Sequence, residues 1–245
     1  MKTVKTLFIA LLIAVISPVS AQTADEIIDN YFENTGGKAN WEKIESIKRD
    51  GVMKMQGMEI PITIVMNKEG KTYTEIDLQG TKMIWTAFDG TTLWEVNQMT
   101  MLPEESDNEA TQNFKNELKD FPSPFLNYKE KGYSIELLGK EIIEGTEAYK
   151  IQLTKDPSIA NGEEIENKPI YYFEVENFVP IIQETKIPFG PMAGTEVKIT
   201  FSDYEEVDGL YFAFSEGSEF QTVEYKEITV NSEIDETKLK MPGKE

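Results

Sequence analysis

After Ile47, apolar and polar residues alternate along most of this chain, which leaves few architectures open to it other than a β-sheet. In segment 60–66, isoleucine and methionine hold the even positions, and proline, threonine and valine hold the odd ones. A period of two places alternate side chains on one face of an extended strand. Asp-Gly pairs at 89–90 and 208–209 join such segments and are typical of two-residue β-hairpin turns. The pattern predicts antiparallel strands.

Turn residues divide these segments into about a dozen strands. Two early strands lie on either side of Gly57, and Gly70 and Gly80 mark further reversals of the chain. We expect the other strands at 71–78, 81–88, 91–97, 133–144, 148–156, 168–176, 180–188, 195–206, 210–220 and 223–231.

Two helices are expected before the first strand. Residues 23–26 have the form of a capping box, in which the Thr23 hydroxyl accepts from an unpaired amide and Glu26 reaches back to the cap. Apolar residues at 27, 28, 31 and 32 follow the helical period, and two glycines at 36–37 end it. A second short helix is expected at 38–46 and would carry Trp41 and Ile44.

A third helix is expected to interrupt the strands at about 106–120. It begins with another capping box at 106–109, and Pro122 and Pro124 end it. Its apolar residues recur every three or four positions: Ala110, Phe114, Leu118 and Phe121. Its other side is expected to face water and carries Glu109, Asn113, Asn116, Glu117 and Asp120.

These elements predict a mainly β (α+β) fold in one domain spanning residues 22–245. The order of elements excludes a doubly wound parallel sheet, in which strands and helices would alternate. We expect a strongly curved antiparallel sheet whose concave face is covered by the helices. A closed, lipocalin-like barrel is the structural alternative, although its interior would need no inserted helix.

Residues 1–21 have the features of a signal peptide. Lys2 and Lys5 precede an apolar run at 7–16, and small residues at 17–21 suggest cleavage after Ala21. The apolar run is shorter than the roughly 20 residues that a membrane-spanning helix needs. No cysteine follows the cleavage point to carry a lipid anchor. We therefore expect export to the periplasm as a soluble protein with no stable membrane anchor.

The composition argues against several functional classes. The chain has no cysteine and no histidine, which excludes disulfides, thiol nucleophiles, Cys-ligated zinc and a Ser-His-Asp triad. Asp and Glu number 44 against 24 Lys and Arg, a net charge of −20, so nucleic acid is not expected as a partner. The sequence contains neither a phosphate-binding glycine loop followed by lysine nor a GxSxG turn.

Acidic clusters offer no better case for an enzyme or a metal site. Asp203, Glu205, Glu206 and Asp208 are close in sequence, but Glu205 and Glu206 would face opposite sides of a strand, unlike the paired carboxylates of a glycosidase. Segment 107–109 could resemble a calcium loop but is better explained as the start of a helix. We predict no catalytic activity, no cofactor and no bound metal.

Four segments resemble those of a known family. Segment 201–212 (FSDYEEVDGLYF) resembles a late-strand signature of exported proteins similar to the lipoprotein carriers LolA and LolB. Segment 87–97 (AFDGTTLWEVN) is similar to a hairpin of the same superfamily, and segments 128–133 and 144–150 fit the branch that carries the FSDY signature. The resemblance extends over most of the chain after residue 21.

This resemblance implies an unclosed β-barrel with a helical lid, which receives acyl chains of lipoproteins in a concave apolar cavity. Two features depart from the family. The carrier LolA holds its lid with an arginine in an early strand-turn segment, where this chain has Asn67-Lys68-Glu69-Gly70. LolB-type receptors are lipid-anchored through a cysteine, which this chain lacks.

Methionines suggest where such a cavity would lie. Five of the ten methionines, at 53, 55, 58, 66 and 83, occur in the first four strands. Methionine repacks easily, which suits a lining that must release its ligand. The predicted lipid-binding cavity consists of Met53, Met55, Ile62, Ile64, Met66, Met83, Trp85 and Trp94. The alternative is that these methionines fill an ordinary core.

Phe114, Leu118 and Phe121 of the third helix are the predicted lid, and a purely structural helix is the alternative. Arg49, the only arginine, is the candidate latch. It shares the parity of Ile47 and Met53, so it could point inward and bond carbonyl groups of the lid loop. A bulge at Gly51 would instead place it in solvent.

Together these features predict a soluble periplasmic carrier or chaperone that binds acyl chains of lipoproteins, or similar lipids, for transfer to the outer membrane. We expect a monomer, with envelope protein partners that would offer basic surfaces to this acidic protein. The alternative is a non-catalytic interaction module of the cell envelope with the same fold, binding a protein or a glycan.

Overall fold

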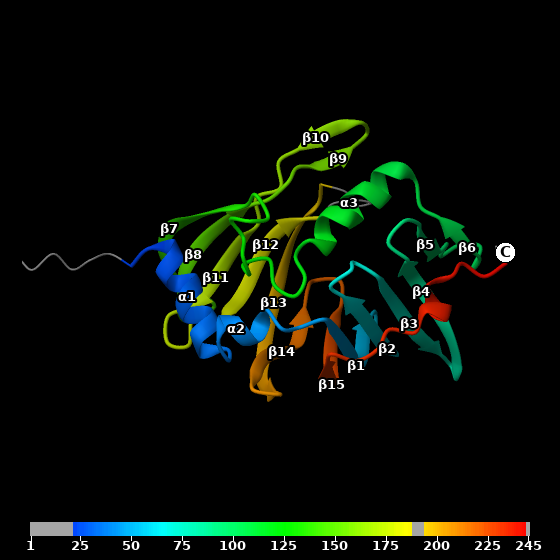
Figure 1. Ribbon diagram of the computed structural model, residues 1–245, viewed down its shortest axis with the longest axis horizontal. Helices are drawn as coiled ribbons and strands as arrows, with labels where there is room; N and C mark the ends of the chain where they lie inside the picture. Colours follow the sequence, from blue (N-terminus) through cyan, green and yellow to red (C-terminus); the bar gives the residue numbers. More distant parts are fainter. Residues whose placement is uncertain (1–21, 188–193, 244–245) are drawn as a thin grey trace, which may run out of the picture.

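The computed structural model describes residues 22–187 and 194–243. The predicted signal peptide lies outside these ranges. Within them, one antiparallel sheet has thirteen strands in the order β6-β5-β4-β3-β2-β1-β15-β14-β13-β12-β11-β8-β7 (Figure 1). A separate hairpin pairs β9 with β10 and extends beyond the sheet.

The first eight strands are β1 (Ser46–Met55), β2 (Met58–Asn67), β3 (Thr72–Leu78), β4 (Thr81–Phe88), β5 (Leu93–Val96), β6 (Pro103–Glu105), β7 (Ser134–Ile143) and β8 (Thr146–Thr154). The others are β9 (Ser158–Ala160), β10 (Glu163–Ile165), β11 (Ile170–Glu174), β12 (Pro180–Lys186), β13 (Glu196–Val207), β14 (Leu210–Gly217) and β15 (Thr222–Val230). Three of them, β6, β9 and β10, were not expected from the sequence.

The sheet is open. Strands β6 and β7 are its two edges, and no ladder joins them among the described residues. Bulges at Asp50/Gly51, Thr74/Glu75, Leu137/Gly139 and Tyr172/Phe173 interrupt the ladders, and bulges bend and twist the strands that contain them. The prediction of an unclosed antiparallel sheet in a mainly β fold is confirmed, and the closed-barrel alternative is wrong.

One predicted turn is confirmed, whereas a second turn and a helix need correction. The turn at Asp208-Gly209 does have two residues, since Val207 pairs with Leu210. The turn at Asp89-Gly90 is wider, because Phe88 pairs with Leu93. The Asp89 carboxylate accepts hydrogen bonds from the amides of residues 91 and 92 at 2.8 Å each and holds them in the turn. The helix predicted at 38–46 is only α2 (Lys38–Trp41).

Helix α1 (Ala24–Asn34) begins with the predicted capping box and buries Ile27, Ile28, Tyr31 and Phe32. It packs against one side of the sheet, which we call the inner face. The inner face carries, among others, Ile47, Ile62, Ile76, Tyr171 and Phe212, which join the residues of α1 and α2 in the largest hydrophobic cluster. The opposite side is called the outer face.

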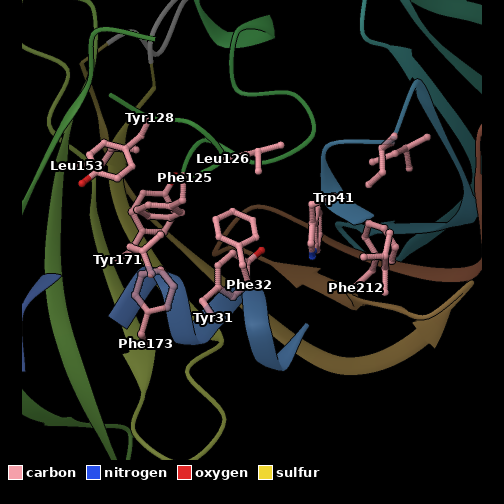
Figure 2. Close-up of a cluster of buried hydrophobic side chains, with 14 of the residues drawn as sticks. Tyr31, Phe32, Trp41, Phe125, Leu126, Tyr128, Leu153, Tyr171, Phe173 and Phe212 are labelled. Atoms are coloured by element: carbon pink, nitrogen blue, oxygen red, sulfur yellow. The ribbon is translucent and has the colours of Figure 1, made fainter. Parts of the chain in front are cut away.

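A segment after the third helix completes this core. Phe125 lies 4.8 Å from Tyr171 and 5.2 Å from Phe173 between ring centroids, in edge-to-face contacts (Figure 2). The ring centroids of Trp41, in α2, and Phe212 are 5.1 Å apart. These aromatic contacts show that the inner face is filled by the chain's own side chains beside β8, β11 and β14.

The remaining two helices cover the other half of the sheet. Helix α3 (Asn108–Leu118) starts at Asp107, whose carboxylate accepts from the Ala110 amide at 2.8 Å, so the predicted cap at Ser106 is displaced by one residue. A short 3-10 helix, η1 (Glu236–Leu239), packs against β3 and β4 near the C-terminal end of the described chain. Figure 1 shows α3 and η1 on the same half of the molecule, away from α1 and α2.

Candidate functional site

Five of the eight residues predicted to line a cavity lie together on the inner face. Paired residues of neighbouring antiparallel strands lie on the same face, so the register assigns each side chain to a face. Ile62 pairs with Ile76, and Ile76 pairs with Met83. All five contact the largest hydrophobic cluster: Met53, Ile62, Ile64, Met83 and Trp85. Ile62 is buried, and the other four are half-buried. We call these four residues the inner strip.

Met66 and Met55 lie apart from this group. Met66 packs with Phe88 and Leu93 in a smaller cluster beneath α3. Met55 is half-buried at the end of β1, where it pairs with Met58 across the hairpin. Met58 is 51% exposed, so the methionine-rich segment extends from the inner face into solvent at this hairpin.

Trp94 lies on the outer face and is not part of the inner strip. It packs with Val65, Tyr73 and Ala87 under Leu239 of η1. Its Nε1–H donates a 2.8 Å hydrogen bond to the Leu239 carbonyl oxygen, and the residue is 1% exposed. This tryptophan therefore serves to attach the C-terminal segment.

The apolar side of α3 packs on the sheet as the sequence predicts. Phe114 and Leu118 contact Phe88 and Leu93, and the rings of Phe88 and Phe114 are 5.7 Å apart in an edge-to-face arrangement. Phe121, which follows the helix, packs against the largest cluster. The three predicted lid residues thus lie over two adjacent apolar areas of the inner face.

The polar side of α3 does not simply face water, as we expected, but contacts segment 155–167. The Asn113 side chain is 1% exposed, donates to the Ile159 carbonyl oxygen at 2.7 Å and accepts from the Ile159 amide at 2.7 Å. The Glu109 carboxylate accepts from the amides of Asn161 and Gly162 at 2.9 Å each. The helix is therefore held on both sides, by apolar contacts below and polar contacts above.

Lys155 forms a buried electrostatic contact at the C-terminal end of α3. Its ammonium group lies 3.0 Å from the Glu117 carboxylate and 2.6 Å from that of Asp120, and its side chain is 4% exposed. Burial opposes the charge on Lys155, but the attraction of Asp120 and Glu117 outweighs burial and raises the pKa of Lys155. Burial raises the pKa of Asp120. A charged pair so poorly exposed is much less screened than a surface pair.

A second lysine lies close to this group without forming an ion pair. Lys131 donates to the Ser123 carbonyl oxygen at 2.7 Å. Burial lowers the pKa of Lys131 to about 8, against a weaker opposing attraction from Asp120. Burial also raises the pKa of Tyr133, which lies in the field of Asp120. These groups form a polar layer beneath the C-terminal end of α3.

Arg49 points to the inner face. It pairs with Ile64 of β2 and with Ile228 of β15, both of which belong to the largest cluster or contact it. Its guanidinium lies 5.8 Å from the centroid of the Tyr225 ring, a cation–π contact. The bulge at Asp50/Gly51 is present, but it follows Arg49 and does not turn the side chain outward. No hydrogen bond to a lid carbonyl is found for Arg49 among the residues that the structure describes.

A hollow with a volume of about 860 Å³ lies elsewhere in the described chain. It is bounded by the β9–β10 hairpin, by β12 and β13, and by the turn between β14 and β15. Its walls carry charged residues of both signs, including Glu184, Lys186, Glu196 and Lys198. None of the eight predicted cavity residues lines it.

No group of three or more acidic side chains in residues 22–187 and 194–243 could hold a metal ion. No helix in these ranges has the length and apolar character needed to cross a bilayer.

Comparisons with known proteins give matches at the level of structure alone. No protein-family model matches the sequence, and no curated protein matches it. A LolA superfamily protein from Nitrosomonas europaea superposes with a TM-score of 0.55 at 14% identity, over 90% of this chain and 99% of the other. A DUF1329 family protein from Desulfovibrio piger gives 0.54 at 14% identity, over 90% and 98%. A domain assigned to outer membrane lipoprotein-sorting proteins, from Vibrio parahaemolyticus, gives 0.51 at 12% identity, over 87% and 94%.

At such low identities these matches show the fold, and they cover nearly the whole of each chain. They agree with the resemblance carried by segments 87–97 and 201–212, which β4, β5, β13 and β14 contain. The protein therefore has the fold of the LolA superfamily, a mainly β fold built on an open antiparallel sheet.

Proposed function

We propose that this protein is a periplasmic carrier that binds acyl chains of lipoproteins, or of similar lipids, against the inner strip. The observation that carries the proposal is the presence of four half-buried apolar residues, Met53, Ile64, Met83 and Trp85, on the inner face of a LolA-like sheet. Each methylene that an acyl chain buries there would contribute about 0.8 kcal/mol. Two methionines among the four would let the strip adapt to its ligand and release it.

In this proposal α3 is a cover that moves to admit the ligand. Its apolar side contacts Phe88 and Leu93, and an acyl chain could replace these contacts. Its polar contacts with Ile159 and Lys155 would keep it attached to segment 155–167 while its apolar side separates from the sheet. The functional role that we propose for the residues around 114–121 is therefore exclusion of water from a bound chain.

The protein's tryptophans allow a direct test of acyl binding. The chain has three, of which Trp41 and Trp94 are buried and Trp85 belongs to the inner strip. A brominated fatty acid quenches tryptophan fluorescence at short range. We expect saturable quenching of the mature protein, lost for the most part in Trp85→Phe and retained in Trp94→Phe, its matched control on the outer face. Absence of saturable quenching in the unmodified protein would contradict the proposal.

The proposed movement of α3 can be tested with a disulfide, since the chain has no cysteine of its own. A side chain at position 70, in the turn between β2 and β3, would begin 3.9 Å from the Cδ1 atom of Leu118. The double variant Gly70→Cys/Leu118→Cys should therefore tether α3 to the sheet when oxidised. Gly70 has a φ of +80°, so the single variant Gly70→Cys is the control for the strain that a side chain adds there. We expect slower acyl uptake in the oxidised form and recovery on reduction. Equal uptake in both forms would show that α3 is a fixed structural helix.

A different outcome would favour an envelope interaction module. Mass spectrometry under native conditions, on protein purified from the periplasm, should reveal co-purified acyl species if the protein is a carrier. Protein that is consistently free of lipid and shows no quenching would instead direct attention to the charged hollow between β12 and β13 as a site for a protein or glycan.

A further inference from the structure

Arg49 is a cation placed within an apolar surface. Along its row of paired residues, Ile228 lies on one side and Ile64 on the other, and Met53 follows on the same face of β1. The ring of Tyr225, itself buried, lies beneath the guanidinium. Arg49 is half-buried, so part of the guanidinium's hydration is lost.

This arginine has no hydrogen-bond or ion-pair partner within residues 22–187 and 194–243, although the chain carries 44 acidic residues. The two lysines of β1 differ from Arg49 because they lie on the other face and have ion-pair partners. Lys48 and Lys54 lie on the outer face, where Lys48 pairs with Asp50 at 2.7 Å and Lys54 with Glu224 at 2.6 Å. A partly desolvated charge without a partner is costly, and an anionic ligand would remove that cost.

Glu216, an acidic residue on the inner face, does not neutralise Arg49. Glu216 of β14 pairs with Val223, a member of the largest cluster, and so lies on the same face. Burial raises the pKa of Tyr225; Glu216 raises it further, whereas Arg49 lowers it. Their charged groups are not within ion-pair distance of each other. Glu216 instead limits how strongly a second anion can bind beside Arg49, which favours reversible binding.

The position of Arg49 also suits an elongated ligand. Its row continues from Ile64 to Thr74 and then to Thr86, which is next to Trp85. Three strand spacings separate β1 from β4, roughly 14 Å at ~4.8 Å per spacing. An acyl chain with its head group at Arg49 would therefore cross Ile64 and reach Trp85 near its middle.

We propose that the inner face selects acyl ligands with an anionic head group, and that Arg49 is the residue that binds this group. The guanidinium offers a planar pair of N–H donors that matches a carboxylate or a phosphate. The inference rests on the proposed carrier function and specifies its ligand class. It also assigns Arg49 a role other than holding the lid.

The test compares ligands that differ only in head-group charge. Trp85 quenching is titrated with a brominated stearic acid, with the methyl ester of the same acid, and with a lysophosphatidic acid that carries the same brominated chain. We expect the ionised acid to bind about tenfold more tightly than the ester, as for one charge-assisted hydrogen-bonded pair. In Arg49→Gln the acid should bind only as tightly as the ester, whose own affinity should not change.

Two variants provide controls. Lys48→Gln removes a neighbouring positive charge from the outer face and should leave the preference for the acid unchanged. Glu216→Gln removes the opposing carboxylate and should strengthen binding of the acid but not of the ester. Circular dichroism and thermal melting would establish that each variant is folded, and Arg49→Lys should retain part of the preference if Arg49→Gln proves unstable.

The outcomes separate the two proposals. If no ligand quenches Trp85, the carrier proposal fails. If acid and ester bind the unmodified protein equally, the carrier proposal stands and the selection of anionic head groups is wrong. An Arg49-dependent preference for either anion supports the inference, and the tighter of the two anions identifies a fatty acid or a phospholipid as the source of the head group.

Discussion

The ammonium group of Lys155, in the segment that follows β8, lies 2.6 Å from the carboxylate of Asp120, just beyond the end of α3. This contact attaches the predicted lid helix to a segment that is distant in sequence. The Lys155 side chain is 4% exposed and that of Asp120 is 19% exposed, so removing the lysine would leave a largely buried carboxylate without its counterion.

We therefore expect Lys155→Met to lower the free energy of unfolding by about 3 kcal/mol at neutral pH. The loss should shrink toward acidic pH. The pKa of Asp120 is already raised by burial and would rise further without Lys155, so the carboxyl would become neutral as the pH falls. Urea denaturation at several pH values measures both effects.

Lys168→Met is the matched control for that experiment. Lys168 pairs with Glu166 at 2.7 Å, but the two side chains are 38% and 78% exposed. Exposed pairs contribute at most about 1 kcal/mol. Equal destabilisation by the two variants would show that the Lys155 contact is not a buried anchor of α3.

Asn113 is expected to be the second attachment of α3. Its side chain makes two 2.7 Å hydrogen bonds with the backbone of Ile159 and is 1% exposed. Asn113→Ala should lower stability by about 2 kcal/mol, because it leaves the amide and carbonyl groups of Ile159, in the partly buried strand β9, without these partners. Amide hydrogen exchange at Ile159 should accelerate as well.

Asn116→Ala is the comparison for this substitution, since Asn116 lies one turn away, is more exposed and bonds the Pro157 carbonyl oxygen only at 3.5 Å. It should cost less than about 1 kcal/mol. Unchanged exchange at Ile159 in Asn113→Ala would be inconsistent with the attachment.

Lys131 should make stability depend on alkaline pH. Its pKa is lowered to about 8 in the folded protein by burial, while an unfolded chain holds this lysine near its ordinary value of 10.5. Between these values the unfolded state binds more protons than the folded state. The contribution of Lys131 to stability is therefore present above the unfolded pKa and is lost as the pH falls through 8.

This behaviour can be measured as the difference in unfolding free energy between the unmodified protein and Lys131→Met. As the pH rises from 8 toward 10.5, the unfolding free energy of the unmodified protein should increase relative to that of Lys131→Met. The corresponding difference for Lys129→Met should not increase over this pH range, because Lys129 is paired with Asp25 and its pKa is raised. A flat difference for Lys131→Met would indicate that its amine is well hydrated.

Trp94 should matter for stability and not for ligand binding. Replacing it with phenylalanine removes the donor to the Leu239 carbonyl oxygen and part of a fully buried side chain. We expect a loss of about 2 kcal/mol and earlier proteolysis of the segment after residue 231. Trp85→Phe, at a half-buried position, should cost less. The reverse order of these two losses would contradict the assignment of Trp94 to an anchoring role.

Much of the fold follows from local patterns. The capping box at Thr23 and Glu26 and the helix that carries Phe114 and Leu118 were predicted because their signals lie within a few residues of sequence. The strand period and the turn at Asp208-Gly209 are local in the same sense. Errors occurred where a side chain changed a turn locally, as Asp89 does by accepting from the two amides that follow Gly90.

The candidate site was predicted less completely. Alternation placed Ile62 and Ile64 on one face of a strand, since strand parity is a property of the sequence. The register between β1 and β2 adds Met53 to that face. Alternation could not assign Trp94 to the outer face, because that face becomes buried only when Leu239 folds back from the end of the chain. Nor could it show that the β9–β10 hairpin covers the polar side of α3 near Asn113.

The sequence by itself determined most of the strands and helices, and which residues within one strand share a face, because these properties depend on spacing along the chain. Only the tertiary structure decided what each face meets. It placed Phe125 and α1 over one half of the inner face and α3 over the other, paired Lys155 with Asp120, and left Arg49 without a described partner. Such contacts join residues far apart in sequence, and their energies depend on burial, which no local pattern encodes.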